Sequence, residues 1–218
     1  MHSFTEENYL KIIYHLSAGI DGEVSTNALS EQTQTKAASV SDMLRKLADK
    51  NLIHYKKYQG VRLTEAGQRI ALAVIRKHRL WEVFLVQKLG FGWDEVHHIA
   101  EQLEHIDSEE LIAKLDEFLD FPKTDPHGDP IPDQLGEMPL HQAQCRLSEI
   151  KVGQKVVMMG VAEDTPAFLQ YLDKTGLKLG CGLLIEEENA FDKSLRVSIN
   201  GQSAQFLSHE VAKCLLVK

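Results

Sequence analysis

The sequence predicts a mainly α-helical protein with a small all-β domain at its C-terminal end. Three observations support this fold class. The first 64 residues have the order helix, helix, turn, helix, two-stranded hairpin; a long helical stretch follows; and after a segment rich in proline, glycine and aspartate come short strands separated by glycine turns. We therefore expect a winged helix-turn-helix over residues 1–64, a helical domain over 65–140 and an SH3-like barrel over 141–218.

The opening segment has the pattern of an amphipathic helix. Its apolar residues between Tyr9 and Leu16 recur at offsets of three, four and seven positions, which places them on one helical face. Ser3 and Glu6 have the spacing of a capping box, in which each side chain satisfies a backbone N–H of the first turn. A second, short helix is expected over residues 27–32.

The third helix and the hairpin carry the residues that we expect to contact DNA. In TKAASVSDMLRKLADKNLI, Val40, Leu44 and Leu47 form an inward stripe, and IHYKKYQGVRLT has the pattern of two short strands. In a winged helix-turn-helix the second helix of the motif enters the major groove, where Lys and Arg neutralise phosphates and short polar side chains reach base edges. The candidate DNA-contacting residues are Lys36, Ser39, Ser41, Asp42, Arg45, Lys46, Lys56 and Lys57. Small helical domains with a hairpin also occur as protein-binding modules.

A long helix is expected from residue 65 to about residue 89, because Ile70, Val74 and Leu85 share one face. Residues 90–93 interrupt it, a further helix is expected from about residue 94, and SEELIAKLDEFL begins another behind a Ser N-cap. The apolar faces of these helices are candidates for a dimer interface, although each large residue also fits a core position. The candidates are Trp81, Phe84 and Phe118.

The segment DFPKTDPHGDPIPDQLGEMP predicts a domain boundary, since it is crowded with Pro, Gly and Asp. After it, KVGQKVVMMGV, GCGLLIEEE, SLRVSING and KCLLVK have the pattern of short strands, with one helix near residues 165–174. About five strands in some 70 residues fit a small barrel.

Composition places the chain among globular proteins, with 43% hydrophobic and 26% charged residues. The net charge of −8 is unevenly distributed: residues 36–69 hold eight Lys and Arg against three Asp and Glu, whereas residues 101–137 hold two Lys against twelve Asp and Glu. These blocks indicate two surfaces with different partners, or merely two solvated faces. We expect a cytoplasmic protein without a membrane span, because no apolar run approaches about 18 residues and no signal peptide opens the chain. The three scattered cysteines predict reduced thiols rather than a disulfide framework or a thiolate zinc site.

One short stretch, HHIAEQLEH, places four potential metal ligands on one side of a helix. His97, Glu101, Glu104 and His105 stand at offsets of 0, +4, +7 and +8, which fall within a sector of roughly 100°. In RKHRLWE, upstream of this stretch, a His and a Glu follow at i and i+4; these residues are His78 and Glu82. Imidazole nitrogens and carboxylate oxygens are the ligand set for Mn(II), Fe(II), Co(II), Ni(II) or Zn(II). Without a metal such carboxylates repel one another, and the alternative is a plain solvated face.

The motifs of this chain resemble those of the diphtheria-toxin-repressor family of iron- or manganese-dependent transcriptional regulators. The resemblance rests on TEENYLKIIYHL, VSDMLRKLADKNLI, LTEAGQRIALAVIRKHRLWEVFL, EVHHIAEQLEHIDSEEL and PHGDPIP. It extends over nearly the whole chain, including the C-terminal barrel, which is then of the FeoA-like type.

The resemblance implies two neighbouring metal sites and one or two Mn(II) or Fe(II) ions per chain. Glu101, Glu104 and His105 match the ligands of one site, which a residue at position 8 completes. The second site is matched by His78, Glu82 and His97, and in some members groups of the C-terminal domain complete it. In this chain a carboxylate at the corresponding place is Glu163 or Asp164.

This sequence departs from the family pattern at three positions. Position 8 is Asn8 where members have Asp or Met, so that only a neutral amide oxygen is offered. Lys11 replaces a carboxylate of the manganese-type members, and Glu101 replaces the Cys of the iron-type members. Hard oxygen ligands favour Mn(II) somewhat, and Fe(II) stays open.

The resemblance also implies the function: a homodimeric repressor of metal-uptake genes that binds operator DNA when Mn(II) or Fe(II) is bound. The metal would join the first helix to the ligand helices and hold two winged domains about 34 Å apart, one turn of DNA. Two alternatives are a winged-helix regulator that responds to a non-metal effector and, less favoured, a dinuclear metalloenzyme. The chain lacks a nucleophile motif and a phosphate-binding loop, so we do not expect an enzyme.

Overall fold

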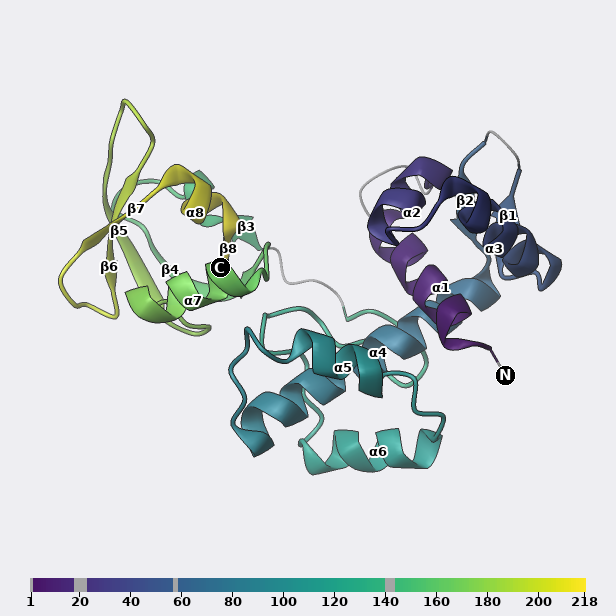
Figure 1. Ribbon diagram of the computed structural model, residues 1–218. Coiled ribbons are helices and arrows are strands. Elements are labelled where there is room, and N and C mark those ends of the chain that lie inside the picture. The colour runs from purple at the N-terminus through teal and green to yellow at the C-terminus, as the bar shows by residue number, and fades with distance from the viewer. Residues whose placement is uncertain (1, 18–22, 57–58, 140–143) are drawn as a thin grey trace. The chain divides into compact units, whose positions relative to one another are not determined.

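The structure, a computed structural model, describes residues 2–17, 23–56, 59–139 and 144–218. The chain forms two compact units. The first contains residues up to 78 together with 101–109 and 132–137, and the second contains residues 79–100, 110–131 and 138–218. Helix α4 (Glu65–Leu89) runs without interruption from the first unit into the second (Figure 1).

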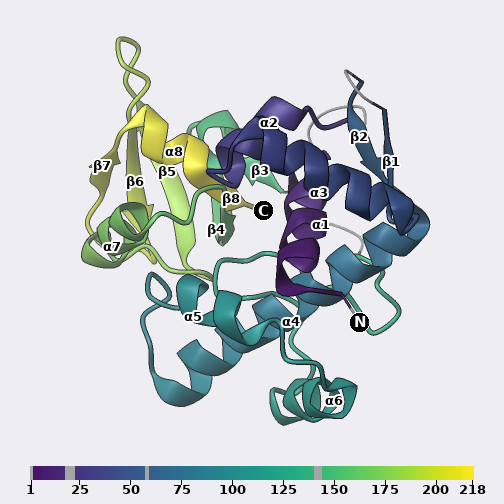
Figure 2. The same ribbon diagram turned by 45° about the vertical axis from the view of Figure 1, so that its right-hand side comes forward.

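The first unit is a winged helix-turn-helix, as predicted. Its elements are α1 (Phe4–Ser17), α2 (Thr26–Gln32), α3 (Ala37–Asp49), β1 (Ile53–Tyr55) and β2 (Val61–Leu63). Helix α3 buries Val40, Leu44 and Leu47, whose spacing keeps them on one face against the core. The antiparallel hairpin of β1 and β2 follows the C-terminal end of α3, and in Figure 2 it forms the wing.

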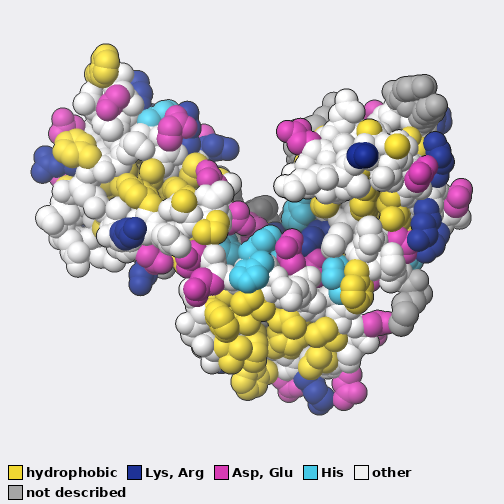
Figure 3. Space-filling view, viewed as in Figure 1, with side chains coloured by type: hydrophobic (Ala, Val, Ile, Leu, Met, Phe, Trp, Pro, Cys, Tyr) yellow, Lys and Arg dark blue, Asp and Glu magenta, His cyan; other side chains and the backbone are white. Residues whose placement is uncertain are grey.

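In the second unit, helices pack around a small apolar core. The second half of α4 and α6 (Glu109–Phe118) contribute Leu80, Val83, Ile112 and Leu115 to it. Helix α5 (His97–Leu103) starts three residues later than expected, because residues 93–95 form a turn in which the Glu95 carboxylate accepts the Gly92 N–H. Hydrophobic side chains also gather outside, over the end of α4 and α6 (Figure 3). The exposed large hydrophobic residues of α4, α6 and the segments that follow them are Leu89, Phe91, Leu111, Phe118 and Phe121.

The C-terminal part of the second unit is a six-stranded antiparallel sheet in the order β3-β8-β4-β5-β6-β7. It has two edge strands, so the SH3-like barrel is not closed. The core lies between the sheet and α7 (Pro166–Thr175), where Leu169 and Leu172 are buried with Ile185 and Val197. The remaining elements are β3 (Cys145–Arg146), the 3-10 helix η1 (Leu147–Glu149), β4 (Lys155–Val161), β5 (Gly182–Glu188), β6 (Leu195–Ile199), β7 (Gln205–Leu207), α8 (His209–Cys214) and β8 (Leu215–Val217).

The proline-rich segment before the sheet is a tightly folded loop. One Asp125 oxygen accepts the backbone N–H groups of His127 and Asp129, and the Arg79 guanidinium contacts the Pro130 carbonyl. Gly128, with φ +94°, lies so close to β4 that a Cβ atom would stand 2.2 Å from the Met159 carbonyl oxygen. Only glycine tolerates both the conformation and the approach.

Within the described residues, no helix combines the length and the apolar character required to cross a bilayer.

Candidate metal centre

The carboxylate of Glu104 is the centre of a buried polar cluster in the first unit. Its side chain is 0% exposed, and its two oxygens accept from Lys11 Nζ at 2.6 Å and from His78 Nδ1 at 2.5 Å. Burial alone would raise the pKa of Glu104, but the hydrogen bond from His78 and the positive charge of Lys11 hold it below the ordinary value. We call Glu7, Asn8, Lys11, His78, Glu101, Glu104 and His105 the Glu104 cluster.

His105 is held in an orientation that suits a metal ligand. Its Nδ1 donates to Glu7 Oε2 at 2.6 Å, and the Phe4 ring stacks on the imidazole with centroids 4.6 Å apart. The other nitrogen, Nε2, lies 3.7 Å from Glu104 Oε1. Histidines that bind metals usually donate the N–H of the distal nitrogen to a carboxylate or carbonyl, and His105 has this arrangement.

Asn8 lies on α1 between Glu7 and Lys11, two other residues of the Glu104 cluster. Its Oδ1 atom is buried and has no hydrogen-bond partner among the described residues. A buried carbonyl oxygen without a partner costs free energy, so an oxygen-seeking cation fits this position. Glu101 is half exposed, and its carboxylate lies 4.0 Å from Lys11 Nζ. The donor set of amide and carboxylate oxygens with imidazole therefore fits Mn(II) or Fe(II).

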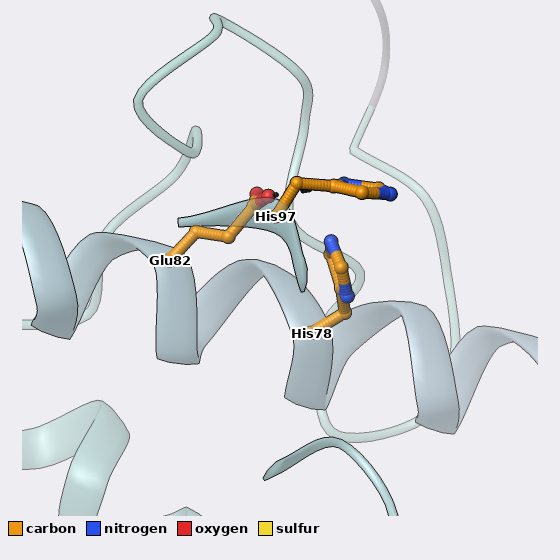
Figure 4. A group of neighbouring side chains, drawn as sticks. All are labelled: His78, Glu82 and His97. Carbon is orange, nitrogen blue, oxygen red and sulfur yellow. Dashed lines mark ion pairs between the residues drawn. The ribbon is translucent and has the colours of Figure 1, made fainter. Parts of the chain in front are cut away.

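A second group of potential ligands surrounds Glu82. His78 and Glu82 stand one turn apart on α4, and the side chains of both and of His97 gather over the same stretch of that helix (Figure 4). One ligand atom from each lies within 4.8 Å of the others. His97 Nδ1 is 3.5 Å from Glu82 Oε1. The four residues of the predicted stripe therefore divide between two groups. His97 lies beside Glu82. Glu104 and His105 come after the end of α5 at Leu103 and belong to the Glu104 cluster.

Asp125 and His127 belong to this second group, and sequence reasoning missed them. Glu82, Asp125 and His127 are buried, and one ligand atom of each lies within 4.8 Å of the others. The Nε2 of His127 donates to the Trp93 carbonyl at 2.9 Å, which leaves Nδ1 on the side of Glu82, 3.7 Å from Oε2. Both residues lie in the segment DFPKTDPHGDPIPDQLGEMP, whose composition predicts only a domain boundary, and the family motif PHGDPIP within it contains His127 but not Asp125. We call Glu82, His97, Asp125 and His127 the Glu82 cluster.

Two buried groups of the Glu82 cluster, His127 and Asp125, have raised pKa values. Burial alone would lower the pKa of His127, but a hydrogen bond to Glu82 and its negative charge raise it to about 9. Burial, with the charges of Glu82 and Asp129, raises the pKa of Asp125 to about 7. Buried carboxylates this close together are stabilised by a positive charge, which a proton or a cation can provide.

Of the two carboxylates predicted from the C-terminal domain, Glu163 has contacts within that domain. Glu163 accepts from Thr165 Oγ1 at 2.8 Å and lies 3.8 Å from Cys214 Sγ. Among the described residues, neither Glu163 nor Asp164 belongs to the two groups around Glu82 whose ligand atoms lie within 4.8 Å of one another.

The candidate DNA-contacting residues lie on and near α3. Most are exposed, and Arg45 pairs with Asp42 at 2.8 Å. Ser41 donates its hydroxyl to the Ala37 carbonyl within the helix. Lys36 precedes α3, Ser39 is exposed on its first turn, Lys56 follows β1, and Lys57 lies outside the described residues.

Helix α1, which bears Asn8, is tied to α3 by the buried carboxylate of Glu6. Lys50 and Lys46 donate to it at 2.7 and 3.0 Å, and the Ser3 N–H donates as well. Burial alone would raise the pKa of Glu6, yet these donors lower it to about 2. A carboxylate next to the Glu104 cluster is therefore joined to the helix that carries the candidate DNA contacts.

Of the three candidate interface residues, Phe118 is the most exposed, at 62%. Trp81 and Phe84 are partly buried against the helical core, with their rings 5.8 Å apart. Phe84 and Phe118 lie 6.3 Å apart, so the aromatic row runs from the partly buried Trp81 and Phe84 to the exposed Phe118.

Comparison with known sequences identifies relatives along the whole chain. A family model for the N-terminal DNA binding domain of iron dependent repressors matches residues 1–61, the model for their metal binding and dimerisation domain matches residues 64–133, and a FeoA domain model matches residues 145–218. The iron-dependent repressor IdeR of Mycobacterium leprae is 30% identical over 226 residues, which are 98% of this chain and 96% of the relative. IdeR of Mycobacterium tuberculosis is 35% identical over 162 residues, 71% of this chain and 70% of the relative.

Solved structures of metal-dependent repressors are also similar to this chain along nearly its whole length. A manganese-dependent transcriptional repressor in complex with manganese has a TM-score of 0.84 and 35% identity, covering 97% of this chain and 98% of that one. ScaR with bound Zn2+ has a TM-score of 0.75 and 31% identity, covering 98% of both chains.

These matches confirm the predicted resemblance and the fold class, with its winged helix, helical domain and SH3-like C-terminal domain. They also confirm the prediction of a transcriptional regulator rather than an enzyme, because the relatives are transcriptional repressors. The chain belongs to the family of iron-dependent repressors.

Proposed function

We propose that this protein is a repressor that binds operator DNA as a homodimer in the cytoplasm when Mn(II) or Fe(II) occupies its ligand clusters, and that it controls genes of metal uptake. Metal-dependent DNA binding follows from the family. The main structural support for the proposed metal sites is the Glu104 cluster. It brings Lys11 of α1, His78 of α4 and the Glu104–His105 pair that follows α5 into one buried polar group, and Asn8, with its buried oxygen, lies three positions before Lys11 on α1.

We propose that Asn8, Glu101, Glu104 and His105 hold one ion. A divalent cation at this place would supply positive charge and a cross-link between α1 and the residues after α5. The chain's own groups prepare the place: Glu7 orients His105, and the buried Asn8 oxygen lacks another partner among the described residues. Because Glu6 joins α1 to Lys46 and Lys50, an anchored α1 also restrains α3.

We propose a second ion at His78, Glu82 and His97, with Asp125 and His127 as additional candidates. The burial of Glu82, Asp125 and His127 supports this assignment, as does the Trp93 carbonyl that orients His127. Glu163 or Asp164 remains a weaker candidate from the C-terminal domain. The ion count is thus one or two per chain.

On the DNA side, we propose that the exposed residues of α3 and the wing contact the operator in the major groove, with Lys46 shared between DNA and Glu6. We propose dimerisation through the apolar patch that includes Phe118, which would hold two α3 helices about one DNA turn, or roughly 34 Å, apart. The division into domains 1–64, 65–140 and 141–218 is part of this proposal, and the ranges of the three family models support it.

Selection of duplexes from a random library with Mn(II) present should yield a preferred operator. Fluorescence anisotropy on that duplex should then show binding that Mn(II) or Fe(II) strengthens and a chelator removes. Glu104→Gln should abolish the metal dependence, because it removes the buried charge at the centre of the cluster. The exposed control Glu31→Gln on α2 should keep it. Equal affinity in metal and in chelator would overturn the proposal and favour a regulator with a non-metal effector.

A further inference from the structure

Lys11 places a positive charge inside the proposed metal centre. Its side chain is only 12% exposed, and its ammonium lies 2.6 Å from one Glu104 oxygen and 4.0 Å from a Glu101 oxygen. Both carboxylates belong to the ligand set proposed above. A lysine at this place is therefore in contact with the groups that a divalent cation would use.

The surroundings explain why the ammonium is held there. Glu104 is fully buried, and an isolated buried carboxylate is strongly destabilising unless a cation or several donors compensate it. Asn8 contributes an oxygen but no negative charge. Each carboxylate of the cluster is thus shared between the fixed ammonium and any ion that enters.

We propose that Lys11 is a tethered cation that stabilises the metal-free protein by neutralising Glu104 and weakens the binding of Mn(II) or Fe(II), so that it raises the metal concentration at which the repressor responds. This inference rests on the proposed function of the Glu104 cluster.

Like charges close together in a poorly solvated site repel strongly, so the ammonium opposes a divalent ion at the same oxygens. The same ammonium supports the fold, because its removal leaves Glu104 with less compensation. Lys11 thus acts in opposite directions on folding and on metal affinity. A residue with a purely structural role would, when removed, lower stability without improving metal binding.

The test is isothermal titration of the full chain with MnCl₂, combined with thermal unfolding in chelator. Lys11→Met removes the ammonium, and Lys11→Gln removes the charge but keeps a hydrogen-bond donor, so that one variant remains if the other does not fold. Lys11→Arg keeps the charge. The control is Lys213→Met, which removes the lysine of a Lys–Glu pair on α8, 2.9 Å from Glu210 and outside both clusters.

We expect Lys11→Met and Lys11→Gln to bind Mn(II) on the order of tenfold more tightly, or more, and to melt at lower temperature in chelator. Lys11→Arg should bind like the wild type, and Lys213→Met should leave the Mn(II) affinity unchanged. Unchanged or weaker binding in both charge-removing variants would overturn the inference. The proposed function fails separately, and the inference with it, if the wild type binds no Mn(II) or if Glu104→Gln binds it as well as the wild type.

Discussion

Gly128→Ala tests how closely the loop that bears Asp125 and His127 must approach the sheet. The methyl group would stand 2.2 Å from the Met159 carbonyl oxygen and 2.5 Å from the Gly160 Cα, at a φ of +94°. Gly180 is the matched control in the same unit. Its φ is +83°, and an added Cβ would meet no heavy atom within 4 Å.

The two glycines separate the cost of conformation from the cost of contact. Alanine in the left-handed region costs roughly 1–2 kcal/mol at either position. At Gly128 the backbone must also move away from β4, which costs about 1–3 kcal/mol of overpacking. That movement also endangers the hydrogen bond of 3.0 Å from the Val161 N–H to the His127 carbonyl, worth about 1 kcal/mol. Gly128→Ala should therefore be about 2–4 kcal/mol more destabilising than Gly180→Ala.

Urea unfolding of the full chain, followed by tryptophan fluorescence, measures this difference, since the Trp93 ring stacks on His127 with centroids 6.1 Å apart. A second readout is Mn(II) affinity, which Gly128→Ala should weaken through displacement of His127 while Gly180→Ala leaves it unchanged. Equal destabilisation by the two variants would refute the reasoning, because it would mean that the loop can retreat from β4 at no cost.

Three further predictions concern the rest of the chain. Glu6→Gln should destabilise the first unit by about 2 kcal/mol at neutral pH, less than the full pKa shift implies because its lysine partners are more than one third exposed. Since the folded pKa of about 2 lies below the ordinary glutamate value of 4.5, this stabilisation is complete above about pH 4.5 and disappears as the pH falls towards 2. Urea titrations across this range should show the difference vanish, and a constant difference would contradict it. Leu44→Ala, at a fully buried position of α3, should cost about 2–5 kcal/mol in the same assay, and a loss under 1 kcal/mol would show that the core is looser than described. Phe118→Asp should shift sedimentation from dimer to monomer, whereas Phe191→Asp, 96% exposed in the C-terminal domain, should not; a dimer in both would exclude the α6 patch as the interface.

Local sequence patterns predicted most of the helices and strands, although α5 begins later than expected and β3, β7 and α8 were not predicted. The inward stripe of Val40, Leu44 and Leu47 predicted α3, because side-chain burial repeats with the helical period whatever the partner surface is. The apolar period likewise predicted the length of α4. The stripe from His97 to His105 was less simple, since α5 ends at Leu103 and its ligands divide between two clusters.

By itself, the sequence determined the kinds of ligand available and the family, since both are properties of residue types in order along the chain. Only the tertiary structure could bring Lys11 to Glu104, 93 positions away, or turn the proline-rich loop so that His127 faces Glu82. It also decided that the Asn8 oxygen is buried without a partner among the described residues. The physical reason is that periodicity reports which face of a segment is buried, whereas the partner of a buried charge depends on how distant segments pack.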